Sequence, residues 1–235
     1  KTAVNLNKSL YTSLVSGFFF PLHERLKKHD SVAIRKKMEE SQWWDKERLQ
    51  DYQLSHLRNF LSNVQAHVPY YKQLFAELDF DVASIQSLSD LERIPLLNKS
   101  IIREHTEALK SNQAQHLIRN NTGGSSGEPL VFFIGKRRVS HDIAAKWRAT
   151  RWWDVDIGDT EMVIWGSPIE LGAQDRLRNL RDWILRTRLL PAFEMSEQKL
   201  DQFLGEIRRV RPKMLFGYPS ALSHIARHAE EKGLV

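Results

Sequence analysis

The chain has 235 residues, of which 41% are hydrophobic and 27% charged, so it is long enough for one large globular domain or two small ones. It contains no cysteine, which excludes disulfide bonds, thiol catalysis and cysteine-ligated zinc. The formal net charge of +6 favours anionic partners such as nucleotides, although a modest basic excess is also typical of a solvated surface.

The N-terminal segment contains no predicted membrane span. Its most apolar stretch, residues 17–22, is far shorter than the ~20 residues that a spanning helix needs, and Pro21 interrupts it. The preceding residues lack the continuous apolar core and the cleavage site of a signal peptide. Because the sequence begins with Lys1 rather than Met, we expect that processing or truncation has removed the true start. The absence of cysteine fits a reducing cytoplasm, so we predict a cytoplasmic protein.

Residues 1–110 are predicted to form a helical N-terminal region. Apolar residues recur at helical spacing from Ser31 to His67, which predicts one or two amphipathic helices. Pro69 then interrupts this pattern, and proline is well suited to the first position of a new helix. Further helical segments are predicted at Tyr70–Leu78, Ser87–Leu91 and Ser100–Ala108.

Residues 111–235 are predicted to form the first part of an α/β nucleotide-binding domain. Two strand-like runs, His116–Arg119 and Leu130–Ile134, flank a segment rich in glycine and serine, which predicts a β-hairpin with a long tip. Beyond it, strands alternate with helices as in parallel βαβ units. The predicted helices are Val139–Trp153, Asp175–Arg188, Ser196–Val210 and Pro219–Lys232, and the predicted strands are Met162–Trp165, Leu189–Phe193 and Lys213–Phe216.

The segment Thr122–Pro129 has the composition of an anion-binding loop. Its three glycines let the backbone turn sharply and approach a ligand closely, and Thr122, Ser125 and Ser126 supply hydroxyl groups. Consecutive backbone N–H groups in such a loop form a concavity that suits a triphosphate. No Gly-Lys-Ser/Thr follows, so this is not a Walker loop. The alternative is a flexible hairpin tip, which would not require Pro129 or apolar strands on both sides.

Two strand ends in the second half are followed by turns that contain glycine and proline. These turns are residues 166–168 and 217–220. Parallel sheets bind ligands beyond the carboxyl ends of their strands, so we expect both turns to lie at a cleft.

The glycine segment also carries a family resemblance. Asn121–Leu130 resembles the phosphate-loop signature of the acyl-adenylate-forming (AMP-binding) superfamily, specifically its phenylacetate-CoA ligase and CapK (capsular polysaccharide biosynthesis) branch. An upstream lead-in and a downstream turn match in the same order, whereas the resemblance before Asp30 is negligible. The matching parts outside the loop are His67–Lys72, Ser87–Leu91, Ile94–Lys99 and Gly217–Leu222.

The resemblance implies an ATP-dependent ligase that acts in two steps. A carboxylate attacks the α-phosphate of Mg²⁺-bound ATP to give an acyl-adenylate and pyrophosphate, and a thiol such as coenzyme A, or another acceptor, then displaces AMP. The implied phosphate-binding residues are Thr122, Gly123, Gly124, Ser125, Ser126 and Gly127, and the implied acyl-substrate pocket comprises Trp165, Gly166, Gly217, Tyr218, Pro219 and Ser220.

Two departures narrow the resemblance. A lysine commonly occupies the position of Glu128 in the wider superfamily, whereas an acidic residue is the familiar form in the CapK-like branch. The aromatic-Gly-x-x-Glu segment, the ribose-binding aspartate and the lid lysine of the family are not recognisable before Val235. The resemblance therefore covers the N-terminal portion alone, implies a catalytically incomplete chain and assigns no catalytic residue.

Other constellations carry weaker signals. His224 and His228 share a helix face, but no glutamate lies between them as in metalloproteases, so no metal site is predicted. The arginines between residues 176 and 188 are interpreted as paired surface charges. The tryptophans between residues 147 and 153 are interpreted as packing between a helix and a sheet. A nucleic-acid partner is therefore not predicted.

Two rival functions stay open. One is a non-catalytic scaffold derived from an adenylation domain, and the other is a basic module that binds a polyanion or a protein. The sequence does not identify the acyl substrate, because one architecture serves many acids. It also does not identify the acceptor or the oligomeric state.

Overall fold

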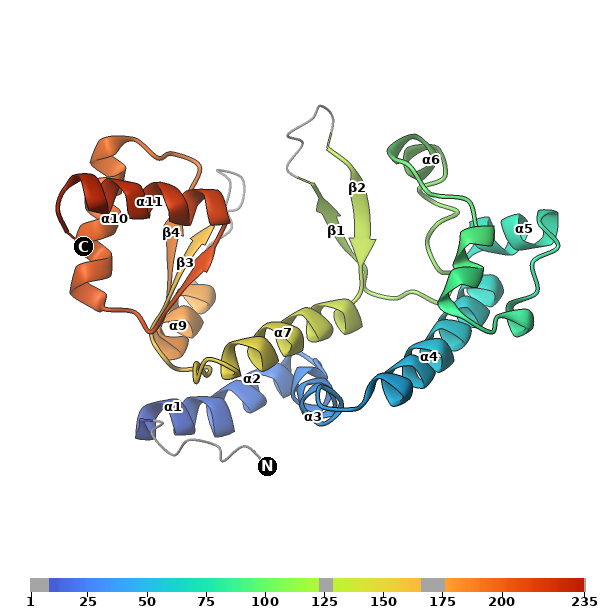
Figure 1. Ribbon diagram of the computed structural model, residues 1–235, viewed down its shortest axis with the longest axis horizontal. Coiled ribbons are helices and arrows are strands. Elements are labelled where there is room, and N and C mark those ends of the chain that lie inside the picture. Colours follow the sequence, from blue (N-terminus) through green and yellow to red (C-terminus); the bar gives the residue numbers. More distant parts are fainter. Residues whose placement is uncertain (1–8, 123–128, 166–175, 235) are drawn as a thin grey trace. The chain divides into compact units, whose positions relative to one another are not determined.

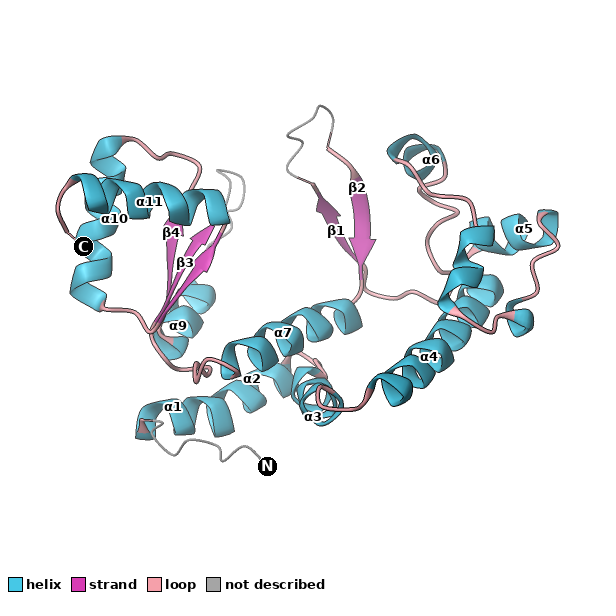
Figure 2. Ribbon diagram, viewed as in Figure 1, coloured by secondary structure: helices cyan, strands magenta, loops and turns pink. Residues whose placement is uncertain are grey.

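The computed structural model describes residues 9–122, 129–165 and 176–234 of the chain. Within these residues, helices are combined with a two-stranded antiparallel sheet and a three-stranded parallel sheet (Figure 1). Helices precede the first sheet and alternate with the strands of the second (Figure 2). The mixed α/β fold class predicted from the sequence is confirmed.

The chain divides into two compact units. One comprises residues 1–28 and 145–235, and we call it the sheet unit; the other comprises residues 29–144, and we call it the hairpin unit. The predicted division of the protein into residues 1–110 and 111–235 stays a prediction.

The helices of the hairpin unit follow the proline and capping signals of the sequence. The periodic stretch predicted as one or two helices forms two, and the next helix begins at Pro69, where a missing N–H costs nothing. Ser87 and Asp90 form a capping box around a short 3₁₀-helix. The elements are α3 (Ser31–Ser41), α4 (Lys46–His67), α5 (Pro69–Glu77), η2 (Val82–Ser84), η3 (Leu88–Arg93) and α6 (Lys99–Glu104).

The predicted hairpin is confirmed. β1 (Ile118–Asn121) pairs antiparallel with β2 (Val131–Ile134). β1 begins two residues later than predicted, because His116 has a φ of 53°, which is not a strand conformation. α4 contributes Leu61 and α5 contributes Phe75 to the buried core of this unit. The other core residues are Phe80, Val82 and Ile85.

The first helices of the sheet unit were not predicted from the sequence. These helices are α1 (Leu10–Leu14), the π-helix η1 (Val15–Phe19) and α2 (Phe20–Leu26), and the apolar stretch 17–22 lies within η1 and α2. The buried ring of Phe20 packs edge-on against buried Trp147 of α7 (Lys136–Arg151), with 5.0 Å between ring centroids. Trp147 is therefore a packing residue, as predicted, but its ring partner lies on a helix and not on a sheet. The same packing role predicted for Trp152 and Trp153 was wrong, because they are 55% and 81% exposed. No helix in the described part of the chain is long and apolar enough to cross a membrane.

The parallel βαβ arrangement predicted for the second half is also confirmed. Central strand β3 (Glu161–Trp165) pairs in parallel with β4 (Thr187–Pro191) on one side and with β5 (Met214–Gly217) on the other. Side chains alternate between the two faces of a strand, so Met162 and Ile164 share one face. They are buried in one core with residues of α10 (Glu197–Val210) and α11 (Pro219–Glu231).

The end of the helix before β4 was predicted three residues too late. The helix expected over residues 175–188 is α9 (Arg176–Leu185), and the following strand begins at Thr187 instead of Leu189. Arg186 has a φ of 55°, a left-handed conformation that ends a helix. Its carbonyl accepts a hydrogen bond from the N–H of Glu161, at 3.1 Å, which aligns β4 with β3.

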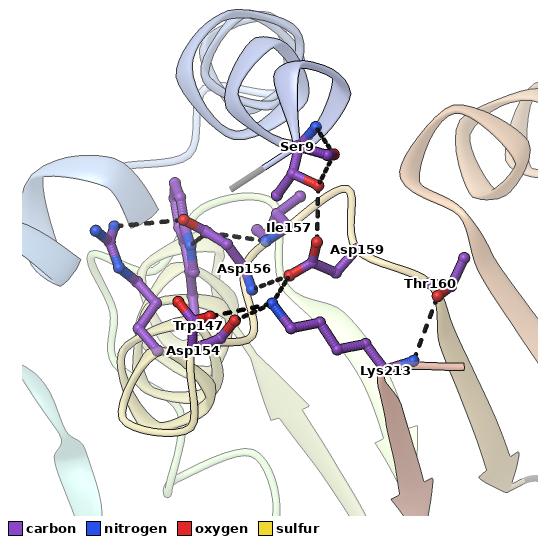
Figure 3. A network of polar contacts seen from close by, with 10 residues as sticks. Ser9, Trp147, Asp154, Asp156, Ile157, Asp159, Thr160 and Lys213 are labelled. Atoms are coloured by element: carbon purple, nitrogen blue, oxygen red, sulfur yellow. Dashed lines mark hydrogen bonds and ion pairs between the residues drawn. The ribbon is translucent and has the colours of Figure 1, made fainter. Parts of the chain in front are cut away.

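A partly buried polar network ties α1 to the amino end of the parallel sheet (Figure 3). The Asp159 carboxylate accepts hydrogen bonds from Thr12 Oγ1 at 2.7 Å and from the N–H of Asp156 at 2.9 Å. It also pairs with Lys213 Nζ at 3.1 Å. Burial raises the pKa of Asp159, but these hydrogen bonds and the lysine charge outweigh burial, so the pKa lies below its usual value. The network therefore favours an ionised Asp159.

We predict that Asp159→Asn lowers the free energy of unfolding by about 1–2 kcal/mol at pH 7, because the charge-assisted hydrogen bonds are lost. The lowered pKa means that this stabilisation is complete above the unfolded-state pKa and is lost as the pH falls through the folded-state pKa. The difference between variant and wild type should shrink below about pH 4. Urea unfolding at several pH values measures it.

Exposed Glu194, on the loop after β4, provides the control: Glu194→Gln should change stability by less than about 0.5 kcal/mol. A loss for Asp159→Asn that is equally large at pH 3 and pH 7 would contradict the role assigned to the carboxylate.

Candidate functional site

The base of the glycine loop is closed by Thr122. Its N–H donates to the carbonyl of Leu130 at 3.0 Å, and its Oγ1 accepts from the N–H of Leu130 at the same distance. Pro129 has no N–H, so Leu130 provides the first donor after it. Thr122 and Leu130 thus continue the ladder of β1 and β2 by one side-chain-assisted pair.

Of the predicted phosphate-binding residues, the structure describes Thr122, which is exposed. Gly123, Gly124, Ser125, Ser126 and Gly127 lie outside the described residues, so their role stays a prediction. Thr122 Oγ1 accepts a hydrogen bond from the N–H of Leu130, and its hydroxyl proton is still available for donation to a ligand.

The described residues of the predicted acyl pocket lie at the carboxyl end of the parallel sheet. The rings of Trp165 and Tyr218 stack with 4.0 Å between centroids and 15° between planes. Phe216 lies on Trp165 at 6.3 Å and 14°. These three rings keep 37%, 44% and 39% of their surface exposed, in the order Trp165, Tyr218, Phe216. The strand ends therefore present a stacked aromatic surface that is open to a ligand.

Gly217 brings β5 close enough to β3 for this stack to form. It pairs with Ile164, and a Cβ built on Gly217 would lie 2.3 Å from the Ile164 carbonyl oxygen and 2.9 Å from its Cβ. Real Cβ atoms do not approach a backbone oxygen so closely, so no larger residue fits without moving the strand. The close approach of this pair fixes Tyr218 beside Trp165.

Tyr218 is also the residue before α11, and Pro219 is the first residue of that helix. Exposed Ser220 follows in its first turn. A helix N-terminus carries partial positive charge, which favours an anionic group at this edge of the sheet. The structure thus brings Trp165, Gly217, Tyr218 and the start of α11 together, while Gly166 lies outside the described residues.

Two residues next to this surface were missed by the sequence analysis. Phe216 extends the stack, and Lys146 Nζ of α7 lies 4.3 Å from the Phe216 ring centroid in a cation–π contact. Lys146 also pairs with Glu161 of β3. Neither contact has a local sequence signal, because both depend on which strands become neighbours.

The histidines of α11 do not converge on a metal-binding geometry. Buried His228 Nε2 bonds to Asp201 Oδ1 at 2.8 Å, and this hydrogen bond lowers the pKa of Asp201. His224 is exposed on the same helix. Across the described ranges, no group of three His, Asp or Glu side chains is placed to hold a metal ion.

Comparison with known proteins gives matches in sequence and in fold. The chain is 20% identical over 179 residues to protein CapK from Staphylococcus aureus, covering 76% of this chain and 40% of CapK. Its fold is similar to 2-hydroxyisobutyryl-CoA ligase in the postadenylation state with 2-HIB-AMP, with TM-score 0.59, 21% identity, and coverage of 80% of this chain and 40% of the ligase. No protein-family model matches the sequence.

A second structure of this ligase, in the thioesterification state with 2-HIB-AMP and CoA, gives a TM-score of 0.53 at 22% identity, over 81% of this chain and 41% of the ligase. The predicted resemblance is thus confirmed as a similarity to CapK and to the fold of a CoA ligase. At these identities the solved structures establish a shared fold. The chain spans about 40% of the length of these proteins.

We predict that Gly217→Ala destabilises the protein by about 2–3 kcal/mol, because the new methyl group overlaps the backbone of Ile164. Chemical denaturation measures the change. Gly205 of α10 is the matched control, since a Cβ there meets nothing within 4 Å and alanine is the better helix former. Gly205→Ala should stabilise by about 0.5–1 kcal/mol. Equal effects of the two substitutions would contradict the close approach of β5 to β3.

Proposed function

We propose that this chain supplies the N-terminal portion of an ATP-dependent adenylate-forming ligase. The ligase would activate a carboxylate as an acyl-adenylate and transfer the acyl group to a thiol such as coenzyme A or to another acceptor. One observation carries the proposal: a glycine and serine segment with the adenylate-forming signature joins two antiparallel strands, in a chain with the fold of a CoA ligase.

The proposed role of the loop is electrostatic. The Ser125 and Ser126 hydroxyls, with the N–H groups of Gly124 and Gly127, hold the β- and γ-phosphates of ATP. A carboxylate oxygen attacks the α-phosphorus, the bond to the bridging oxygen breaks, and negative charge builds on the departing pyrophosphate. Fixed donors stabilise that charge without giving a proton or forming a bond. Thr122 supports them by closing the base of the loop.

The proposed site for the acyl group is the aromatic surface at the carboxyl end of the parallel sheet. Trp165 and Tyr218 offer flat apolar faces to an organic acid, and the start of α11 favours its negative charge. This surface suits a phenylacetate-CoA ligase-like or CapK-like enzyme of aromatic acid or polysaccharide metabolism. We place the reaction in the cytoplasm, which agrees with a chain that has no cysteine.

Magnesium would reach the enzyme with ATP and neutralise charge on its phosphates. In the part of the chain that the structure describes, no cluster of His, Asp or Glu fits the ion, so we assign no residue to it. The steps assigned to this chain are binding and orientation of the phosphates and of the acid.

We predict that Ser125→Ala combined with Ser126→Ala weakens Mg²⁺-ATP binding about tenfold or more, because hydrogen bonds to charged groups are each worth about 1.5–3 kcal/mol. Binding of the carboxylate should change little. Isothermal titration of the natural protein containing this chain measures both affinities. The matched control is Ser55→Ala with Ser62→Ala, which removes two exposed hydroxyls from α4. Equal loss of both ligands, or no loss of either, would exclude the loop from phosphate binding.

We further predict that Tyr218→Ala raises the KM for the carboxylate about tenfold, since an aromatic face in contact with substrate is lost, and leaves the KM for ATP nearly unchanged. Trp153→Ala serves as the control, because Trp153 is 81% exposed and lies away from the strand ends. If Tyr218→Ala changes both KM values equally, the aromatic surface is not the acyl pocket.

A further inference from the structure

A second cavity lies at the amino end of the parallel sheet, opposite to the aromatic surface. It is an open surface cavity of about 510 Å³, lined by the ends of α9 and α10, Thr160 before β3, the start of β4 and Tyr11 of α1. Strands rise about 3.3 Å per residue, so the five residues of β3 separate this cavity from the strand ends at Trp165. The proposed ATP and acyl sites leave this cavity unassigned.

The cavity is positively charged. Arg186, Arg188 and Arg209 line it, together with Asp182. Arg188 and Arg209 share one carboxylate, Glu206, at 2.7 Å and 3.2 Å. Arg181 pairs with Asp182. Four arginines thus face two carboxylates, which leaves an excess of two positive charges around the cavity.

Arg186 is held in place without a carboxylate partner among the described residues. Its backbone is fixed by the left-handed turn after α9 and by the hydrogen bond to Glu161. Its guanidinium lies 3.8 Å from the ring centroid of Tyr11. The Tyr11 hydroxyl in turn donates to the carbonyl of Ile184 at 2.7 Å, which fixes the ring. A positioned guanidinium with unused donors suits bidentate binding of a phosphate.

The apolar wall next to these arginines is Trp183, which is 75% exposed. An indole beside a cationic cluster offers a stacking face for an aromatic ring whose phosphate reaches the arginines. We propose that this cavity binds a nucleoside phosphate, with its base on Trp183 and its phosphate between Arg186 and Arg209. The inference is independent of the proposed function.

The size of the cavity favours a small ligand over a nucleic-acid strand. Its volume lies within the range of about 300–1,000 Å³ that is typical of small-molecule sites.

The nucleoside phosphate bound here could come from two sources, a free mononucleotide or the phosphoadenosine end of a coenzyme. Both share the chemistry of a base joined to a phosphate, and the position of the phosphate distinguishes them.

The test is calorimetric titration of the purified protein with AMP and, separately, with adenosine 3′,5′-bisphosphate. We expect saturable binding, with the tighter of the two ligands identifying the source. Arg186→Gln with Arg209→Gln should weaken it at least about tenfold, and Trp183→Ala about tenfold. Arg208→Gln is the matched control, since Arg208 is an exposed neighbour of Arg209 that does not line the cavity. It should leave the affinity unchanged.

The loop variant Ser125→Ala with Ser126→Ala separates this cavity from the proposed ATP site. Nucleotide binding that persists in the loop variant and is lost in the arginine variant supports the proposal, even if the ATP assignment fails. Absence of saturable binding, or equal binding by wild type and arginine variant, would overturn it. Binding of inorganic phosphate as tight as that of the nucleotides would overturn the stacking role of Trp183.

Discussion

The close parallel pairing of β5 with β3 at Gly217 and Ile164 is the constraint on which the candidate acyl site depends. Because Gly217 has no side chain, the two backbones approach until a Cβ would overlap the Ile164 carbonyl. Parallel register then brings both strand ends to one edge, where Trp165 and Tyr218 stack and α11 begins. Gly217 therefore allows the strand pairing that places the two stacked rings and the start of α11 at the same edge of the sheet.

The two ends of the parallel sheet have different physical characters. At the carboxyl end the exposed groups are aromatic rings and a helix N-terminus, which suit an organic acid. At the amino end a partly buried network around Asp159 and Lys213 fixes α1 to the sheet, and the arginines near Tyr11 line a basic cavity. Tyr11 of α1 thus lines this cavity, while Val15 and Phe20 belong to the buried core.

Much of the fold follows from local sequence signals. Pro69 and Ser87 mark helix starts, and the short apolar run Met162–Trp165 identifies a buried strand. Local signals did not identify the end of α9, because Arg186 adopts a left-handed conformation that glycine usually takes. They also missed α1 and α2, because the burial of Phe20 depends on Trp147, which is more than a hundred residues away.

The parts of the candidate site that are contiguous in the sequence were predictable from it. Strand-end turns identified Gly217 and Tyr218, and the glycine-rich composition identified the loop that Thr122 closes. Phe216 and Lys146 join the site through strand register, which no local pattern encodes. The basic run before Arg188 was interpreted as paired charges; Arg181 and Arg188 are paired, whereas Arg186 lies over Tyr11.

The central proposal is that this chain is part of an enzyme that forms acyl-adenylates. The most direct measurement is exchange of labelled pyrophosphate into ATP by the natural protein that contains the chain, with a panel of aliphatic, aromatic and sugar acids. The account predicts exchange that requires both Mg²⁺ and one class of carboxylate, since adenylate formation is reversible. A folded protein that catalyses no exchange with any acid of the panel would contradict it.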